Sequence, residues 1–356
     1  MKTIIRKIDA EHMHPEDFAE AAGILQKGGL VAFPTETVYG LGGDARNPEA
    51  SSKIYAAKGR PSDNPLIVHI ADVKDIEKIC GARADEAVLE KAHALAERFW
   101  PGPLTMILPR GDMIPKQTTG GLDTAAIRFP SHPIAQELIK AAGLPIAAPS
   151  ANLSGRPSTT KAEHVIEDLD GRVDMIIDGG SSEIGLESTI VDLTSESPLV
   201  LRPGFISIEQ LREVIPDVEY DKAIVSRTAD PNIKPKAPGM KYRHYAPKGE
   251  LTIFEGSADK VIEAINSAAA ERKAEGHSVG IMASEEFAGR YVCENIRVLG
   301  SRAHESEVAA HLFDVLRSFD SDGTEYIYGE CFTDGRLGAA IMNRLIKAAG
   351  YHIVKV

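Results

Sequence analysis

Residues 30–42 read Leu-Val-Ala-Phe-Pro-Thr-Glu-Thr-Val-Tyr-Gly-Leu-Gly, an apolar run followed at once by polar side chains. The pattern predicts a buried strand over Leu30–Val38 whose end is rich in hydroxyls. A helical pattern over Ser51–Ala57 and a second apolar strand over Pro65–Ile70 follow. These elements bring hydroxyls, cations, an amide and a histidine toward one region, which is typical of a pocket for anions and small polar molecules.

The composition is that of an ordinary globular protein, and the length favours two domains. The chain has 356 residues, of which 43% are hydrophobic and 26% charged, with a formal net charge of −12. A single core rarely grows beyond about 250–300 residues. The acidic total argues against a broad nucleic-acid surface, so no stable nucleic-acid complex is expected. No apolar run reaches the roughly 18 residues of a membrane helix, and early charges argue against a secretory leader.

The cysteines point to a reducing compartment. There are three, far apart and without a CxxC pair: Cys80, Cys293 and Cys331. Neither a disulfide framework nor a zinc knuckle can be drawn from them, so we expect a cytoplasmic protein with no metal ligands of its own.

The order of elements predicts an α/β fold. Apolar runs over 104–109, 124–129, 145–149, 175–177, 189–193 and 199–201 alternate with amphipathic helices around 18–25 and 88–99. This pattern favours a mixed, twisted sheet covered by helices. From about residue 216 it gives way to a Pro-rich connector, and from 249 strands and helices alternate again in a smaller, Rossmann-like, doubly wound domain without GxGxxG. We therefore expect three parts, namely 1–215, 216–248 and 249–356.

The connector has an unusual charge. Between Asp230 and Glu250 it holds five Lys or Arg and no acid, on an otherwise acidic chain. A local basic segment favours a local anion over a polyanionic lattice. We expect it to fold back over the first domain as a lid that excludes water. A solvated spacer is the alternative.

Two clusters carry the chemistry of a phosphate site. Lys58-Gly59-Arg60 closes a helical pattern, and the glycine permits a turn that presents both cations; cations that complement the helix dipole are the structural alternative. Residues 149–158 (Pro-Ser-Ala-Asn-Leu-Ser-Gly-Arg-Pro-Ser) follow an apolar strand and so lie at its carboxyl end, where ligands bind in open α/β sheets. Their hydroxyls, with Arg156, suit phosphate oxygens, while a polar turn is the alternative.

Three further residues stand out because of their surroundings. Arg128 lies inside an apolar strand and must pair with an acid or face a cavity, because a buried unpaired charge is costly. His69 also lies in an apolar strand, where a core histidine is the default. Arg202 ends a strand, and Ser188 and Thr189 repeat the hydroxyl-rich strand boundary of Thr35 to Thr37.

The P-loop, HExxH and GxSxG patterns are absent. Instead, Lys58-Gly59-Arg60 with Asn64-Pro65-Leu66 and Ser150-Ala151-Asn152 resembles the KxR…SxN signature of the threonylcarbamoyl-AMP synthase family, which has a YrdC-like fold. Residues 33–41, 100–105 and 187–192 are also similar to that family, and the likeness spans roughly residues 12–210. The segment 238–247 and the second domain resemble its longer, two-domain branch.

The resemblance implies synthesis of L-threonylcarbamoyl-AMP from L-threonine, bicarbonate or CO2, and ATP with Mg2+. Pyrophosphate is released, and the product passes to a threonylcarbamoyl transferase that modifies tRNA. It also implies the residues of each subsite. The threonine residues are Thr37, His69, Arg128, Ala148 and Ser188. The ATP residues are Lys58, Arg60, Asn64, Thr124, Ser150, Asn152, Ser158 and Arg202. We expect Lys58 and Arg60 to be catalytic. From the lid formed by the connector, we expect Tyr245, or alternatively Tyr242, to reach the nucleotide.

Two other classes of function are kept as alternatives. The basic connector gives weak support to a non-catalytic RNA-binding module, although aromatic-plus-basic sheet motifs are missing. A carbamoyl transferase of the hydrogenase-maturation type has a similar central domain, but such chains are expected to carry zinc knuckles.

Overall fold

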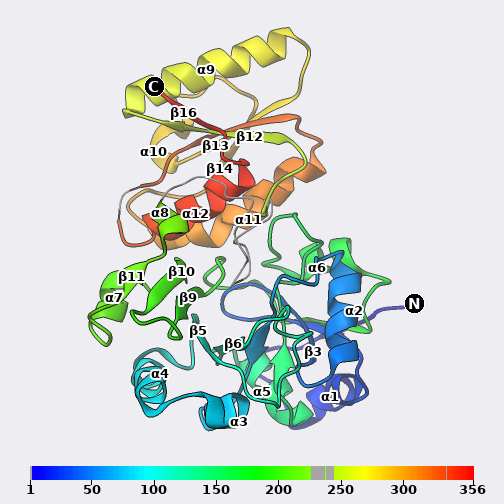
Figure 1. Cartoon of the computed structure of the whole chain (residues 1–356). Coiled ribbons are helices and arrows are strands. Elements are labelled where there is room, and N and C mark those ends of the chain that lie inside the picture. The colour runs from blue at the N-terminus through cyan, green and yellow to red at the C-terminus, as the bar shows by residue number, and fades with distance from the viewer. Residues whose placement is uncertain (1, 226–236, 238–243, 334) are drawn as a thin grey trace.

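A computed structural model describes residues 2–225, 237, 244–333 and 335–356 (Figure 1). The described residues form two α/β halves, and we call residues 2–225 the N-terminal half and residues 244–356 the C-terminal half. Each half has its own sheet, with eleven strands in the first and five in the second. The expected α/β class with a mixed first sheet and a smaller doubly wound second one is confirmed.

The first sheet combines parallel and antiparallel neighbours in the order β1-β8-β2-β3-β7-β4-β6-β5-β9-β10-β11. Its strands are β1 Ile4–Lys7, β2 Val31–Phe33, β3 Gly40–Asp44, β4 Ile67–His69, β5 Leu104–Pro109, β6 Thr124–Arg128, β7 Ile146–Ala147, β8 Met175–Asp178, β9 Thr189–Asp192, β10 Leu199–Arg202 and β11 Glu219–Tyr220. Because β11 pairs with β10, this sheet continues past the boundary expected at residue 215.

Helices cover both faces of the first sheet. They are η1 Pro15–Phe18, α1 Ala19–Gln26, α2 Pro48–Lys58, α3 Asp75–Cys80, η2 Gly81–Arg83, α4 Glu86–Phe99, α5 Pro133–Ala142, α6 Ala162–Leu169, α7 Ile208–Arg212 and α8 Lys222–Val225. Alternate residues of β2 face different cores. Val31 and Phe33 pack with α1 and α5, whereas Ala32 packs with α2, α3, α4 and α6. This is the period of two that a doubly covered strand requires.

The strand predicted over Leu30–Val38 is too long. It ends at Phe33, because Pro34 has no N–H for the ladder and Thr35 Oγ1 accepts from the amides of Thr37 and Val38 in a tight turn. The chain then returns as β3, antiparallel to β2. Its glycines hid this strand from the hydrophobic pattern, yet a Cβ on Gly42 would lie 2.8 Å from the ring of Phe33.

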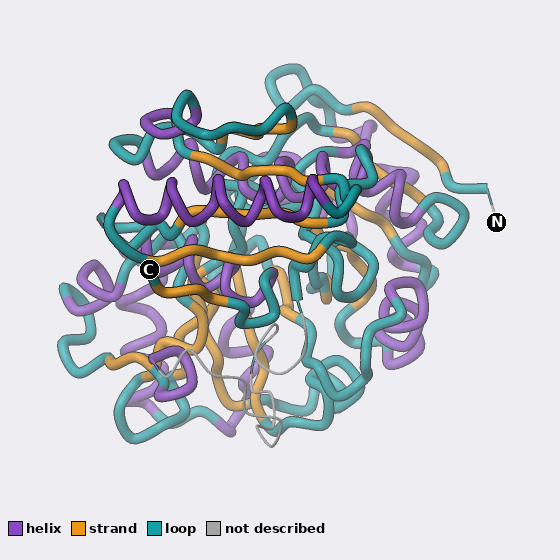
Figure 2. Tube along the Cα trace, turned by 90° about the horizontal axis from the view of Figure 1, so that it is seen from above, coloured by secondary structure: helices purple, strands orange, loops and turns teal. Residues whose placement is uncertain are grey.

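The second sheet is parallel throughout, in the order β14-β13-β15-β12-β16. Its elements are β12 Glu250–Glu255, α9 Ala258–Ala274, β13 Val279–Ala283, α10 Glu285–Ala288, β14 Asn295–Val298, α11 Glu305–Ser321, β15 Tyr326–Glu330, α12 Gly338–Ala348 and β16 Ile353–Lys355. The long helix α9 lies over the outer face of the strands (Figure 2). Helices α11 and α12 cover the other face and lie against the N-terminal half (Figure 1).

The two halves share a packed interface. Val38 and Leu186 belong to the same hydrophobic cluster as α11 and α12. Asp314 of α11 bridges Lys161 at 2.8 Å and His164 at 3.1 Å. At Gly185, which has a φ of +73°, the backbone comes so close to α11 that a Cβ would lie 2.4 Å from Ala310 Cα. No helix among the described residues is long and apolar enough to cross a membrane.

Candidate functional site

The sheet register brings the carboxyl ends of β4, β6 and β10 and the starts of β5 and β9 to one side of the N-terminal half. His69 is directly opposite Arg128 in the parallel pair β4–β6, and Thr105 of β5 is opposite Arg128 on its other side. Strand β9 begins beside the start of β5, and β10 ends in Arg202 opposite Ile190. Side chains that lie far apart in the sequence therefore meet on this side.

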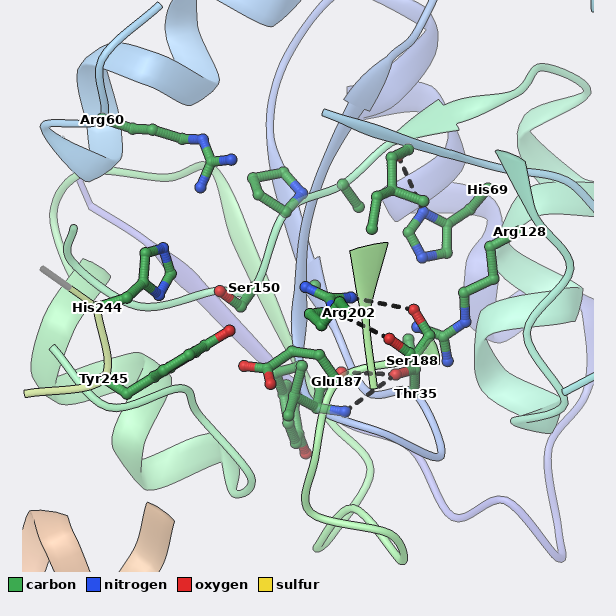
Figure 3. A pocket seen from close by; sticks show the side chains of 16 residues that line it. Thr35, Arg60, His69, Arg128, Ser150, Glu187, Ser188, Arg202, His244 and Tyr245 are labelled. Carbon is green, nitrogen blue, oxygen red and sulfur yellow. Dashed lines mark hydrogen bonds between the residues drawn. The ribbon is translucent and has the colours of Figure 1, made fainter. Parts of the chain in front are cut away.

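A pocket opens on this side, with a volume of about 480 Å3 counted out to its mouth. The pocket is lined by Thr35, Val38, Tyr39, Gly40, Arg60, Ile67, His69, Arg128, Ala148, Pro149, Ser150, Glu187, Ser188, Arg202, His244 and Tyr245. Figure 3 shows His69 and Arg128 at one end, Arg60, His244 and Tyr245 at the other, and Ser150 and Arg202 between them.

Arg128 is buried and keeps unused donors. Its Nη2 lies 2.8 Å from Glu36 Oε1, so the two charges are paired. Within the part of the chain that the structure describes, however, Nε and Nη2 of Arg128 and both carboxylate oxygens of Glu36 have no hydrogen-bond partner. A buried guanidinium with unmet N–H groups in a pocket wall suits a carboxylate ligand.

His69 is neutral in this setting. Burial, together with the charge of Arg128, lowers the pKa of His69 to about 3. The ring contacts the Ile67 carbonyl at 3.2 Å through Nδ1. At neutral pH it is therefore a hydrogen-bonding group and a weak base.

Arg202 and Ser188 form the floor between the two ends. The guanidinium donates to Ser188 O at 3.0 Å and to Ser188 Oγ at 3.2 Å, and Ser188 Oγ is 2.7 Å from Thr105 Oγ1. Burial lowers the pKa of Arg202 from its ordinary value, which still leaves the group charged. The floor of the pocket is thus a fixed positive charge beside a hydroxyl.

Helix α2 ends as its sequence indicates. Gly59 has a φ of +61° and caps the helix, so that Lys58 and Arg60 leave it on either side of the turn. The turn was expected to present both cations, but both side chains are buried in the protein. Lys58 is 2% exposed and donates to the carbonyls of Ser150 and Asn152, whereas Arg60 is 7% exposed and donates to Pro65 O at 3.1 Å.

The two cations of α2 sit close enough to influence each other. Burial and the neighbouring Arg60 hold the pKa of Lys58 well below its ordinary value. Burial lowers the pKa of Arg60 to about 10, so it remains protonated at neutral pH. Only Arg60 lines the pocket, and Lys58 ties the loop that carries Ser150 to the helix end.

The loop 149–158 contributes less to the pocket than its polar residues suggested. Ser150 lines the pocket and donates to Asn152 Oδ1, while the Asn152 amide bonds Arg156 O. Arg156, which we expected to add charge for phosphate, instead pairs with Glu167 and Asp168. Ser158 donates to the Glu187 carboxylate. Most polar groups of this loop therefore fix its shape.

The end of the connector closes one side of the pocket. Tyr245 is 1% exposed, stacks on Phe313 of α11 with ring centroids 5.2 Å apart, and has a φ of +66°, which is unusual for an aromatic residue. Its hydroxyl lies beside Arg202, and burial is the first cause that raises the pKa of Tyr245 to about 12. Backbone strain of this kind clusters at functional sites. Tyr242 lies outside the described residues.

The structure brings together eight of the residues expected in the site. These are Arg60, His69, Arg128, Ala148, Ser150, Ser188, Arg202 and Tyr245. Thr37, Lys58, Asn64, Asn152 and Ser158 lie behind the wall or in the loops that support it, and Thr124 begins β6, four residues before Arg128. Their ligand roles stay predictions.

The sequence reasoning missed pocket residues that adjoin predicted ones. They include Thr35, Glu187 and His244. Each lies one or two positions from a residue that was predicted for the site (Thr37, Ser188 or Tyr245), so the motifs indicated the right segments. Only the turn geometry decides which member of each motif faces the cavity.

The donors of the described residues do not form a metal site. No group of three or more His, Cys, Asp or Glu side chains that could hold an ion occurs among them. The pocket wall instead carries three guanidinium groups, those of Arg60, Arg128 and Arg202.

This fold and site define a two-domain α/β protein with a pocket whose wall carries three arginines. A family model described as "Telomere recombination" matches residues 23–204, and one described as "Threonylcarbamoyl-AMP synthase, C-terminal domain" matches residues 206–350. A threonylcarbamoyl-AMP synthase of Bacillus subtilis is 51% identical over 95% of this chain and 94% of its own length.

Solved structures agree over nearly the whole chain. Pyrococcus abyssi Sua5 complexed with L-threonine is 46% identical, covers 99% of this chain and 100% of its own, and superposes with a TM-score of 0.91. A P. abyssi Sua5 variant in which a histidine and the next tyrosine are replaced by alanine is 45% identical, with a TM-score of 0.91 over 99% of this chain and 98% of its own. This chain belongs to the threonylcarbamoyl-AMP synthase family.

Proposed function

We propose that this protein is an L-threonylcarbamoyladenylate synthase and that the strand-edge pocket is its active site. It converts L-threonine, bicarbonate or CO2, and ATP into L-threonylcarbamoyl-AMP and pyrophosphate. The observation that carries the assignment is the two-ended pocket. One end has a buried arginine with unused donors, and the other is lined by Arg60 and closed by Tyr245.

The end at Arg128 suits threonine. The N–H groups of Arg128 that make no hydrogen bond can bind the amino-acid carboxylate, and Thr35, His69 and Ser188 add polar contacts around a small space. Thr37 supports this wall through its hydroxyl, 2.9 Å from Thr35 Oγ1, and Ala148 keeps the space open. A pocket of this kind discriminates against serine by only about 1–3 kcal/mol, the worth of one methyl group.

The end at Arg60 suits ATP. Arg60, Arg202 and Ser150 can bind phosphate oxygens, and Lys58 holds the loop that carries Ser150 by donating to the Ser150 carbonyl. Asn64, Asn152, Ser158 and Thr124 complete the nucleotide site that the signature implies. The triphosphate brings its own Mg2+, so MgATP is the substrate and the protein needs no resident metal ligands.

The reaction requires two bond-forming steps. The threonine nitrogen adds to the carbon of CO2 and loses a proton, which gives a carbamate. A carbamate oxygen then attacks the α-phosphorus, and the bond from that phosphorus to the bridging oxygen breaks as pyrophosphate leaves. Fixed cations favour this step because they stabilise charge that develops on phosphate oxygens. Holding the carbamate and ATP in one pocket supplies the proximity.

Residues 244–248, the described end of the connector, act as the lid of this site. Tyr245 and His244 lie over the nucleotide end, and a closed pocket protects the labile mixed anhydride from water. One His-Tyr pair exists in this sequence, His244-Tyr245. A histidine followed by a tyrosine is also the pair replaced in the P. abyssi variant. The division into residues 1–215, 216–248 and 249–356 belongs to this proposal.

The product supplies a threonylcarbamoyl transferase that acts on tRNA, and neither a membrane nor a stable nucleic-acid complex takes part. The cytoplasm is the compartment that fits cysteines without disulfides. The near full-length likeness to synthases, together with the lack of zinc knuckles, disfavours the RNA-binding and hydrogenase-maturation alternatives.

Pyrophosphate release tests the proposal directly. Release from MgATP should require both L-threonine and bicarbonate, and serine should support a slower rate. A rate that is equal without any amino acid, or one that depends on carbamoyl phosphate, would contradict the assignment.

A further inference from the structure

Arg344 of α12 extends from the C-terminal half into the N-terminal half. Its side chain is 0% exposed, and it is the largest of the fully buried side chains among the described residues. The guanidinium Nε donates to Glu187 Oε2 at 3.0 Å, and Nη2 donates to Glu187 O at 2.9 Å. Its Nη1 donates to the Pro203 carbonyl. One guanidinium therefore bonds two separate segments of the other half.

Those two segments carry pocket residues at adjacent positions. Glu187 lines the pocket itself and precedes Ser188, while Pro203 follows Arg202. Ser188 and Arg202 bond each other through Arg202 Nε and Nη2. Arg344 thus bonds Glu187, which precedes Ser188, and Pro203, which follows Arg202. Together with the bonds from Arg202 to Ser188, these contacts form a closed ring at the start of β9 and the end of β10.

The Glu187 carboxylate is shared between the loop and the C-terminal half. Its Oε1 accepts from Ser158, which ends the loop 149–158. Through this carboxylate Arg344 also fixes the loop that carries Ser150. Three walls of the pocket therefore converge on one arginine that lies outside it.

We propose that Arg344 is a positioning residue for the synthase reaction, so that the C-terminal half completes the active site. The inference rests on the proposed function. It assigns Arg344 a role beyond attachment of the two halves, because the guanidinium sets the relative position of Ser188 and Arg202.

Other arginines at the interface allow this role to be separated from simple docking. Arg336, on the segment before α12, donates to Phe205 O at 2.7 Å and to Gln210 Oε1 at 3.2 Å, and it is exposed. Neither partner lines the pocket. Replacing Arg336 removes cross-interface bonds without touching the ring around Ser188, so Arg336→Gln is the matched control.

Two substitutions separate the effect of the charge of Arg344 from the effect of its hydrogen-bonding geometry. Arg344→Lys keeps the positive charge but loses the planar fork that bonds two carbonyls and a carboxylate at once. Arg344→Gln removes the charge as well. Burial raises the pKa of Glu187, but Arg344 and then Arg202 outweigh it, so that the pKa lies below its ordinary value. Lys347 of α12 and Tyr245 of the connector also face this carboxylate.

The experiment uses the full chain and compares Arg344→Lys, Arg344→Gln and Arg336→Gln. Threonine and ATP affinities are measured by calorimetry, and pyrophosphate release is measured against pH, each at a temperature well below the variant's own Tm. We expect Arg344→Lys to weaken threonine and ATP binding at least tenfold, with the acid limb of the pH profile unchanged. Arg344→Gln should also move that limb to higher pH. Arg336→Gln should stay within twofold of the wild type.

Binding within twofold of the wild type in Arg344→Lys would overturn the inference, as would losses in Arg336→Gln that match those in the Arg344 variants. If Arg344→Lys does not fold, Gly204→Ala carries the test. Its Cβ would lie 2.5 Å from Thr189 N and 2.8 Å from Ser188 C, so it disturbs the same ring without altering the interface charges. Unchanged affinities in that variant would contradict the positioning role. A wild-type protein that binds both ligands but releases no pyrophosphate would overturn the proposed function alone.

Discussion

Arg128 has a structural role in its ion pair with Glu36, in addition to the threonine-binding role proposed for it. The ion pair with Glu36 offsets part of the free-energy cost of burying a charge in an apolar strand. Among the residues that the structure describes, however, Nε and Nη2 of the guanidinium have no hydrogen-bond partner. A core arginine evolved only for stability would be expected to use its donors fully. These donors are therefore the groups that the proposed threonine carboxylate would bind.

We expect Arg128→Gln to raise the KM for threonine far more than the KM for ATP. A hydrogen bond to a charged group is worth roughly 1.5–3 kcal/mol, which corresponds to about 10- to 150-fold in affinity. Steady-state kinetics with each substrate varied in turn measures this, and thermal unfolding checks the fold, because Glu36 is left without its partner. Equal effects on both substrates would remove Arg128 from the threonine site.

His69 makes stability depend on pH. The folded protein takes up a proton at His69 only near pH 3, whereas the unfolded chain does so near pH 6.5. The unfolded state therefore binds more protons between these values, and the free energy of unfolding falls as the pH drops below about 6.5, by up to about 1.4 kcal/mol per unit.

Urea unfolding at pH 7, 6 and 5 should show this loss in the wild type and a smaller slope in His69→Asn. Some slope should remain, because burial also holds the pKa of His244 well below its ordinary value. His304→Gln, at an exposed position, serves as the control. A slope that is the same in His69→Asn and the wild type would show that His69 is not the group responsible.

At the scale of elements, the sequence predicted strands best where the apolar pattern is continuous. The expected strand over 104–109 has the bounds of β5, and that over 124–129 is one residue longer than β6. The pattern failed at β3, because three of its five residues are glycines and Leu41 is its one large apolar side chain. The place of this strand is set by the side chains that pack on its glycines. The pattern also could not tell pocket residues from supporting ones within a motif. Ser150 and Asn152 are both polar residues of one turn, yet only Ser150 lines the pocket, while Asn152 accepts a hydrogen bond from it.

We expect the hydroxyl of Tyr245 to affect ATP binding and the packing of its ring on Phe313 to affect stability. Tyr245→Phe removes only the hydroxyl beside Arg202, so we expect the KM for ATP to rise about 2- to 10-fold, the worth of one neutral hydrogen bond, with Tm nearly unchanged. Phe313→Leu removes the stacked ring instead and should lower Tm more than it alters the KM. An unchanged KM in Tyr245→Phe would argue that the nucleotide does not reach this side chain.

At the scale of the whole molecule, the alternation of strands and helices was enough to predict two α/β sheets, because each sheet must be covered by its own helices. The way the halves dock could not be predicted. It depends on the close approach of α11 to Gly185, and on ion pairs whose partners are more than a hundred residues apart, such as Lys161 with Asp314. No local pattern records such pairs.

Gly185→Ala should disturb this docking. The left-handed φ already disfavours a side chain, and the new Cβ would meet the backbone of α11 at Ala310. We expect a clear loss of activity while the circular-dichroism spectrum is retained. Gly143→Ala has a φ of +66° but no atom within 4 Å of the new Cβ, so it reports the backbone strain alone. Equal activity in the two variants would mean that the close approach is unimportant.

The described contacts between the halves make no use of the peptide chain that joins them. Arg317 of α11 donates to Asp168 at 2.8 Å, Asp314 bridges Lys161 and His164, and Arg344 bonds Glu187. With the hydrophobic cluster beneath them, these contacts should hold the two halves together without the joining chain. A protein cut once between residues 226 and 236 should therefore elute as a single particle in gel filtration, and the two pieces, expressed separately, should find each other and restore turnover.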